Sequence, residues 1–312
     1  MDRSPARRLS RRLRLALAAS VFWTAAAASE LPPIADAHMH YNWNMAEAYT
    51  PEQAVEIWKA QNVVLAVVAG TPPELALRLQ EAAGDWVVPI WSPYLSPEHR
   101  HNWFLRNEVL EAGRAALESG RYRGIGEVHL IPGLGPRRDN AVFRGLVELA
   151  TEHRVPFMIH TDASSYRFLL PICQEYATTR FVWAHAGGIL PPEQVGALLA
   201  ACPNVWADLS ARDPKRYVLT PITDDTGDLL PGWREVVLAH PDRFMIGSDA
   251  VWPVEQMHSW FQADSGWPMV GEFLDFHRRW ISGLPEDVQQ GILLGNAARI
   301  WAPQRQAAIA DR

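Results

Sequence analysis

Imidazole and carboxylate side chains recur where short apolar segments of the sequence end. The first of these segments carries DAHMH at residues 36–40, and alternation along a strand is expected to put Asp36, His38 and His40 on one face. Four later segments present the same residue types: Glu127 with His129, His160, His185, and Asp249. Each residue alone could be a hydrogen-bonded structural group, but together they are the ligand types that bind zinc and related divalent metals. The set therefore predicts a metal site.

The apolar segments themselves have the composition of buried parallel strands. Runs such as VVLAVVA and WVVPIW are apolar on both faces. Helical patterns alternate with eight such runs: 34–40, 63–69, 86–91, 124–129, 156–160, 181–185, 205–209 and 244–249. Eight β/α units over roughly 270 residues predict one domain, a (β/α)8 TIM barrel over residues 30–312. A doubly wound open sheet is the alternative, but no glycine-rich fingerprint follows a predicted strand.

Three of the expected helices begin at clear caps. Thr50-Pro51-Glu52-Gln53 combines an N-cap, a proline at the first helical position and a capping-box glutamine. Asn140 can cap a second helix, Pro191-Pro192-Glu193 opens a third, and a final helical stretch is expected over 285–301. The active site of a barrel enzyme lies at the carboxyl ends of the strands. Six potential metal ligands fall there: His38, His40, Glu127, His160, His185 and Asp249.

Several of these segments resemble motifs of the amidohydrolase superfamily, specifically its amidohydrolase-related branch, which includes small-acid decarboxylases. The matching segments are DAHMH at 36–40, GIGEV at 124–128, MIHT at 158–161, WAHAGG at 183–188, GSDAVWP at 247–253 and a closing GNAARIW at 295–301. The resemblance implies a barrel that holds one or two divalent ions, which activate water. Zinc fits the mixed histidine and carboxylate ligands, and manganese or iron is less frequent.

The resemblance leaves the number of ions open. In two-ion members a carboxylated lysine or a glutamate on the fourth strand bridges the ions, and Glu127 stands at that position. One ion would then be held by His38, His40 and Asp249, and the other by His160 and His185. In one-ion members the ion is bound by His38, His40, His160 and Asp249, while His185 polarises the substrate. The acid at position 127 favours two ions, and His129 could replace a ligand or contact the substrate.

The expected chemistry follows from the metal. A bound divalent cation lowers the pKa of water towards about 7. Asp249 would accept the proton from this water and pass it to the leaving group. The ion or His185 would stabilise the oxyanion that forms on the attacked carbonyl.

Signals for the substrate are sparse. Arg212, just after the seventh predicted strand, could bind a carboxylate, or it could be a solvated surface residue. Aromatic side chains follow the first and eighth strands and could line an apolar pocket: Tyr41, Trp43, Trp252, Trp260 and Trp267. Trp252 and His129 are the expected substrate contacts besides Arg212. The aromatic residues favour a ring-bearing or lactone substrate over a highly charged one.

Hydrolysis of a C–O or C–N bond, in a lactone, ester or amide, is the leading functional prediction. The alternative from the same branch is non-oxidative decarboxylation of a small aromatic or unsaturated acid, which requires a carboxylate-binding arginine such as Arg212. A nuclease of the same superfamily fits poorly with the acidic chain and the AHAGG segment. A non-catalytic metal-binding protein is disfavoured because such a protein rarely needs a carboxylate base beside its metal.

The first 29 residues resemble a secretory signal peptide. Residues 1–14 hold six arginines and one acid, and a short alanine-rich apolar run follows. Ser10-Arg11-Arg12 also resembles a twin-arginine export signal. A periplasmic or secreted protein without a stable membrane span after removal of the signal is therefore expected, and an uncleaved anchor is the alternative.

Charge and cysteine content limit the partners. Without residues 1–29 the balance is 23 basic to 34 acidic residues, so the domain would repel phosphate backbones and nucleic acid is excluded as an expected partner. A small-molecule substrate is expected, and a homo-oligomer is compatible with the sequence. Cys173 and Cys202 lack the spacing of metal ligands and are expected to be buried free thiols, although a disulfide is the alternative in an exported protein.

Overall fold

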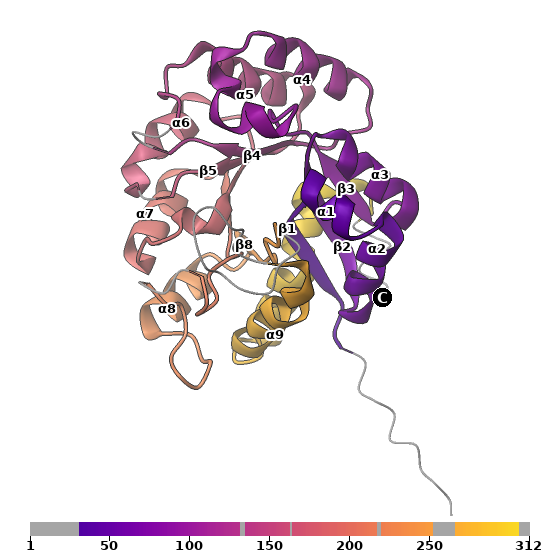
Figure 1. The fold of residues 1–312 in the computed structure, drawn as a ribbon. Helices are drawn as coiled ribbons and strands as arrows, with labels where there is room; N and C mark the ends of the chain where they lie inside the picture. The colour runs from indigo at the N-terminus through magenta and orange to yellow at the C-terminus, as the bar shows by residue number, and fades with distance from the viewer. Residues whose placement is uncertain (1–30, 132–134, 163, 217–219, 252–265, 306–312) are drawn as a thin grey trace, which may run out of the picture. The chain divides into compact units, whose positions relative to one another are not determined.

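The computed structural model describes residues 31–131, 135–162, 164–216, 220–251 and 266–305. Its strands and helices alternate along the chain (Figure 1). The strands are β1 (Ile34–Asn42), β2 (Val63–Thr71), β3 (Val87–Ile90), β4 (Ile125–His129), β5 (Phe157–His160), β6 (Phe181–Trp183), β7 (Val205–Asp208) and β8 (Phe244–Met245). The helices are α1 (Trp43–Ala48), α2 (Pro51–Ala60), α3 (Glu74–Ala83), α4 (Glu108–Glu118), α5 (Ala141–His153), α6 (Leu170–Glu175), α7 (Pro192–Ala201), α8 (Pro231–Ala239), α9 (Val270–Ile281), α10 (Glu286–Gln290) and α11 (Asn296–Trp301).

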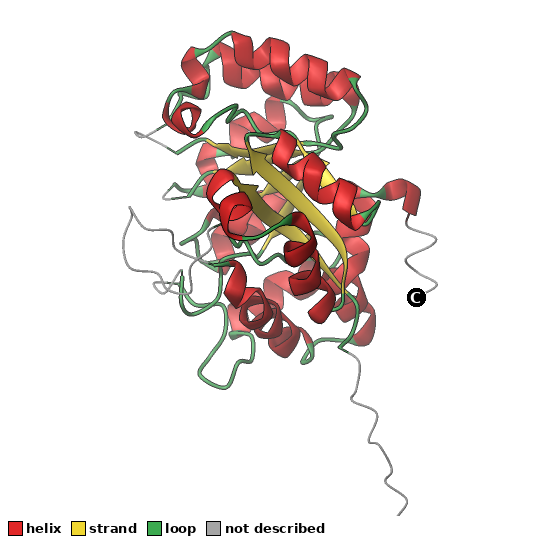
Figure 2. Ribbon diagram, turned by 45° about the vertical axis from the view of Figure 1, so that its right-hand side comes forward, coloured by secondary structure: helices red, strands yellow, loops and turns green. Residues whose placement is uncertain are grey.

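The eight described strands are parallel and close into a barrel. Strand pairing runs in chain order within β1–β3 and within β4–β8. A parallel bridge between Trp91 and Ile125 joins β3 to β4. The ring closes where Ala37 donates its N–H to Ile246 O at 2.9 Å, beyond the end of β8. The predicted (β/α)8 barrel is confirmed, and the helices surround the strands in Figure 2.

Two apolar layers hold the strands in place. Small and medium side chains fill the barrel interior, among them Ala35, Ala37 and Val67, and Trp301 of α11 packs into the same cluster. The second layer lies between strands and surrounding helices and contains larger residues such as Trp58 of α2. The predicted capping box of α2 is present, because Thr50 Oγ1 accepts from Gln53 N and the Gln53 side chain accepts from Thr50 N. Asn140 likewise caps α5.

A bulge in β1 corrects one sequence prediction. Asp36 pairs with Ala66 of β2, whereas Met39 pairs with Val68, so three residues of β1 span two of β2. The extra residue reverses the alternation between positions 36 and 38. Asp36 therefore does not share the face of His38; its Oδ2 accepts from Trp58 Nε1 at 3.1 Å on the helix-facing side.

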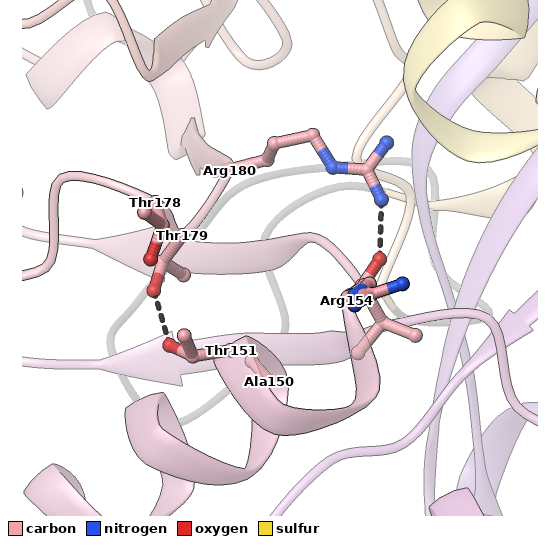
Figure 3. A pocket seen from close by; sticks show the side chains of 7 residues that line it. Ala150, Thr151, Arg154, Thr178, Thr179 and Arg180 are labelled. Carbon is pink, nitrogen blue, oxygen red and sulfur yellow. Dashed lines mark hydrogen bonds between the residues drawn. The ribbon is translucent and has the colours of Figure 1, made fainter.

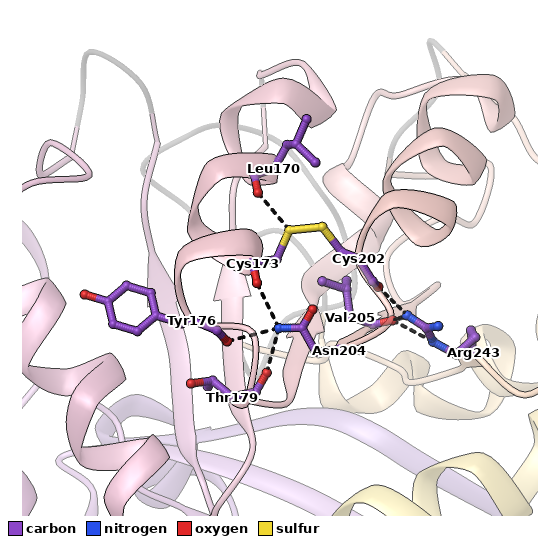
Figure 4. The surroundings of a disulfide bond; sticks show 8 residues. All are labelled: Leu170, Cys173, Tyr176, Thr179, Cys202, Asn204, Val205 and Arg243. Atoms are coloured by element: carbon purple, nitrogen blue, oxygen red, sulfur yellow. Dashed lines mark hydrogen bonds between the residues drawn. A yellow bond between two sulfur atoms is a disulfide. The ribbon is translucent and has the colours of Figure 1, made fainter.

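The two cysteines form a disulfide, so the expected free thiols are wrong. Cys173 of α6 and Cys202 at the end of α7 are both buried, as predicted, and their sulfur atoms are bonded (Figure 4). Asn204 Nδ2 supports the same region by donating to the carbonyl oxygens of Cys173, Tyr176 and Thr179. The bond joins two successive β/α units near the points where β6 and β7 begin. Among the described residues, no helix has the length and apolar character needed to cross a membrane.

Candidate metal centre

The six predicted ligands come together at the carboxyl ends of the strands. His38 and His40 lie in the second half of β1, Glu127 lies in β4 and His160 ends β5. His185 lies in a short turn after β6, and Asp249 follows β8. All are buried except Asp249, which is partly buried.

Four donor atoms form a first group. His38 Nε2 and His40 Nε2 are 3.2 Å apart. Each of these nitrogens lies 3.4–3.6 Å from both Glu127 Oε2 and Asp249 Oδ1. Ligands about 2.1 Å from a tetrahedral zinc ion are separated from one another by about 3.4 Å. The group therefore has the spacing of atoms that surround one ion.

The other oxygen of Glu127 belongs to a second group. Glu127 Oε1 lies 2.7 Å from His160 Nδ1 and 3.3 Å from His185 Nε2. These three residues form a buried set that could hold a metal ion. Glu127 thus presents one carboxylate oxygen to each group. Four imidazoles and two carboxylates fit zinc, manganese or iron.

Residues behind the histidines orient their rings. His38 Nδ1 lies 3.2 Å from Asp208 Oδ2, and His185 Nδ1 lies 3.1 Å from the Ser210 carbonyl oxygen. Because both partners accept, each Nδ1 donates, and in the neutral form of each ring Nε2 keeps its lone pair for a metal. Asp208 also belongs, with His38 and His185, to a third buried set whose atoms lie close enough together to hold a metal ion. The sequence prediction missed Asp208 and Ser210, whose only signal was a polar DLS segment at the end of the seventh strand.

Buried opposite charges determine the electrostatics of the site. Burial would lower the pKa of His38, but the carboxylates of Asp208, Glu127 and Asp249 outweigh burial and raise that pKa well above its ordinary value. Burial would raise the pKa of Glu127, but the surrounding imidazoles lower it well below its ordinary value. The pKa of Asp249 is lowered in the same way. Both carboxylates are therefore ionised at neutral pH, which is the form that binds a metal.

Asp249 is held by its backbone as well as by charge. Its φ of 47° lies in the left-handed region, which is costly for a residue other than glycine. Its N–H donates to His38 O at 2.8 Å, and Arg216 Nη1 donates to its carbonyl oxygen at 3.1 Å. Arg216 also pairs with Asp213 and lies 3.8 Å from the centre of the Phe273 ring. Asp249 is therefore fixed between β1 and the β7–α8 segment.

Arg212, an expected substrate contact, is buried and donates to backbone carbonyl groups, so it is not the solvated surface residue that was the alternative. Its side chain is buried, and its guanidinium donates to the carbonyl oxygens of His185, Ala186 and Leu190 at 2.8–3.1 Å. It also lies over the Trp233 ring. Arg212 therefore stabilises the turn that carries His185, whose φ of 55° is also left-handed.

The predicted aromatic pocket is only partly described. Tyr41 and Trp267 belong to the core: Tyr41 donates to Tyr49 O, and Trp267 Nε1 donates to His40 O. Trp43 is partly buried in α1. The predicted substrate contact Trp252, like Trp260, lies outside the described residues.

A second feature of the structure is a cavity of about 400 Å³, whose lining residues are drawn in Figure 3. Its walls come from the segments that precede β5 and β6, including Arg154 and Arg180. Arg180 Nη2 donates to Arg154 O at 2.5 Å. These segments lead into the strands, whereas the histidines lie where the strands end. The cavity is therefore separate from the metal donors.

Comparison with known proteins identifies the family. The family model described as Amidohydrolase matches residues 22–302. No curated protein matches the chain in sequence. Similar solved structures include a zinc-bound amidohydrolase from Burkholderia multivorans, with 19% identity, TM-score 0.56 and coverage of 86% of this chain and 99% of that chain. A Campylobacter jejuni dihydroorotase has 14% identity, TM-score 0.52 and coverage of 86% and 83%.

A third similar structure is a Pseudomonas putida protein assigned as a 2-pyrone-4,6-dicarboxylic acid hydrolase. It has 17% identity, TM-score 0.59 and coverage of 86% of this chain and 97% of that chain. At these identities the structures show a common fold, while the family model spans most of the sequence. The chain belongs to the amidohydrolase family and is a metal-dependent hydrolase.

Proposed function

We propose that the protein binds two divalent ions, most suitably zinc, and hydrolyses a C–O or C–N bond in a small lactone, ester or amide. The observation that supports this proposal is the position of Glu127. Its two carboxylate oxygens face two different sets of donors, as a bridging ligand would. His38, His40 and Asp249 complete the first set, and His160 and His185 complete the second.

Asp249 and His185 would have different roles in the reaction. Divalent metal bound here would lower the pKa of water towards about 7 and polarise the attacked carbonyl. Asp249, ionised and fixed by Arg216, would accept the proton of the attacking water and return it to the leaving group. In a one-ion arrangement His185, whose pKa is raised to about 9, would instead polarise the substrate. Burial opposes that rise, and the carboxylates of Asp249, Glu127 and Asp162 cause it.

Hydrolysis is favoured over decarboxylation by what the site offers. The decarboxylase alternative depended on Arg212, whose guanidinium donates its hydrogen bonds to backbone carbonyl groups. Relatives of similar fold carry names such as dihydroorotase and 2-pyrone-4,6-dicarboxylic acid hydrolase, which are consistent with an attack on a ring amide or lactone. These names guide the choice of substrates for an assay.

The test combines metal analysis with a substrate screen. Purified protein loaded with zinc is expected to hold two equivalents and to hydrolyse at least one member of a panel of lactones, esters and cyclic amides. The His38→Ala variant should lose at least one equivalent and the activity. Release of CO2 from aromatic acids without any hydrolysis would replace the proposal by the decarboxylase. Activity that survives complete removal of metal would refute both.

We also propose that the protein is exported to the periplasm or secreted. The basic and apolar residues 1–29 motivate this proposal, and the Cys173–Cys202 disulfide supports it because such bonds persist in oxidising compartments. A reporter fused to residues 1–29 should reach the periplasm, and the mature chain should begin near Ser29 or Glu30. Retention of the full-length chain in the cytoplasm would contradict export. Loss of export when Arg11 and Arg12 are changed to lysine would identify the twin-arginine route.

A further inference from the structure

Tyr94 and His129 form a hydrogen-bonded pair at the edge of the metal centre. Tyr94 follows β3, and its side chain is buried. Its phenol oxygen lies 3.0 Å from the backbone N of His129 and 2.5 Å from Nδ1 of the same residue. The His129 ring lies beside that of His160, with 4.5 Å between the centroids.

The two contacts determine where the protons lie. A backbone N–H can only donate, so the phenol oxygen accepts from His129 N. The phenol has a single proton, and of its two contacts among the described residues only His129 Nδ1 can accept it; a proton on Nδ1 would leave this buried hydroxyl without an acceptor there. Nδ1 therefore carries no proton, and the proton of the neutral imidazole must be on Nε2.

This arrangement is the reverse of that at His38 and His185. Those rings have acceptors behind Nδ1, namely Asp208 Oδ2 and Ser210 O, and so present an Nε2 lone pair to the site. His129 has a hydroxyl donor behind Nδ1 and presents an Nε2–H. A protonated ring nitrogen cannot coordinate a metal ion.

We propose that Tyr94 is a positioning residue that keeps His129 in the Nε2–H form, so that His129 is a hydrogen-bond donor to the substrate and not a metal ligand. The proposal rests on the proposed function for the identity of the metal donors. The Nε2 atom lies 3.5 Å from Glu127 Oε2, beside the first group. The His129 side chain is 28% exposed, compared with 1–11% for the four donor histidines. His129 is thus the imidazole best placed to meet a substrate oxygen, such as that of the attacked carbonyl.

The first experiment reads the protonation of the ring directly. Nitrogen-15 NMR of zinc-loaded protein with labelled histidine should show His129 with an unprotonated Nδ1 and a protonated Nε2, the His129→Gln variant serving to assign the signals. Tyr94→Phe should shift the two signals towards each other or exchange them. Tyr122→Phe, another buried tyrosine that precedes β4, should leave them unchanged. A protonated Nδ1 in the wild-type protein would overturn the proposal.

Metal content and kinetics provide the second readout. His129→Ala should keep the wild-type number of bound ions and lower kcat by about 10²–10³-fold, as expected when one oxyanion donor is lost. His129→Gln should recover part of this loss, because its carboxamide can still donate a hydrogen bond. Tyr94→Phe should lower kcat by about 10–100-fold with unchanged metal content. Loss of an ion in His129→Ala would make His129 a ligand and refute the proposal.

Failure of the proposed function would look different. A wild-type protein that binds no ion would refute the metal centre, while the protonation of His129 would still be measurable by NMR. Normal metal content with a protonated Nδ1 would refute the roles of Tyr94 and His129 and leave the metal centre intact.

Discussion

The shared position of Glu127 makes Glu127→Gln the most informative change. Two divalent cations 3.5–4 Å apart repel by about 17–19 kcal/mol at an effective dielectric constant of 20. On the same scale a carboxylate about 2.1 Å from a dication attracts it by about 16 kcal/mol. Glutamine keeps the shape and a carbonyl oxygen but removes the charge that both ions share. The repulsion between the two ions is then no longer offset by a negative charge that lies between them.

The two donor groups should respond unequally. The first group retains two imidazoles and the Asp249 carboxylate, whereas the second retains only the neutral imidazoles of His160 and His185. We therefore expect the second ion to leave. Even one tenth of the lost attraction, about 1.6 kcal/mol, would weaken its binding more than tenfold.

The number of bound ions is measured by titrating metal into the protein and monitoring binding by calorimetry or elemental analysis. Wild-type protein should bind two equivalents and Glu127→Gln one. The exposed Glu152→Gln, which loses only a surface pair with Arg114, is the matched control and should bind two. A wild-type value of one, or two equivalents retained by Glu127→Gln, would refute the bridging role.

Three other substitutions test whether residues bind the metal or stabilise the structure around it. Asp208→Ala removes the acceptor behind His38 and should lower metal affinity about 10–100-fold without changing the number of ions, as measured by competition with a chelator; loss of a whole equivalent would instead make Asp208 a ligand. Arg212→Met should lower the free energy of unfolding by about 2–4 kcal/mol in denaturant titrations, because buried carbonyl groups lose their donors. An effect of Arg212→Met on KM alone, with unchanged stability, would restore its role in substrate binding. Replacing Cys173 and Cys202 by alanine opens a loop with a sequence separation of 29 residues and should cost about 3.5 kcal/mol of stability. Metal content should not change, and a lower number of ions would show that the disulfide end of the barrel is coupled to the metal centre.

Local patterns were sufficient to predict the barrel. Each strand packs against the barrel interior on one face and against helices on the other, so its side chains are apolar on both faces. The apolar runs of the sequence therefore indicate where the strands lie. The positions of the metal donors at strand ends follow from the same pattern, because parallel strands of a barrel all end at one rim.

The errors arose where side chains depend on contacts distant in sequence. The bulge that separates Asp36 from His38 is visible only in the pairing of β1 with β2. Arg212 and Arg216 lie in the same segment, and only the fold shows which guanidinium serves backbone carbonyls and which lies against Asp249.

The sequence also could not predict which ring nitrogen of each histidine carries the proton, because this depends on residues distant in sequence. The orientation of His38 depends on Asp208, which is 170 residues away, and that of His129 on Tyr94, which is 35 residues away. A histidine at a strand end can therefore be predicted as a site residue, but whether it donates or coordinates depends on the group behind its ring.

The disulfide and the metal donors lie at opposite ends of the barrel. If the protein is exported as proposed above, this separation bears on the order in which the metal is bound and the disulfide forms. A chain that crosses the membrane unfolded would meet oxidant and metal together outside the cytoplasm, and the order of the two events would be open. A chain exported in the folded state would acquire its metal in a reducing compartment and close the Cys173–Cys202 bond only afterwards. Because the bond forms away from the donors, the second route would not require the loaded site to reopen. A disulfide that closes before the metal is bound would therefore argue against export in the folded state.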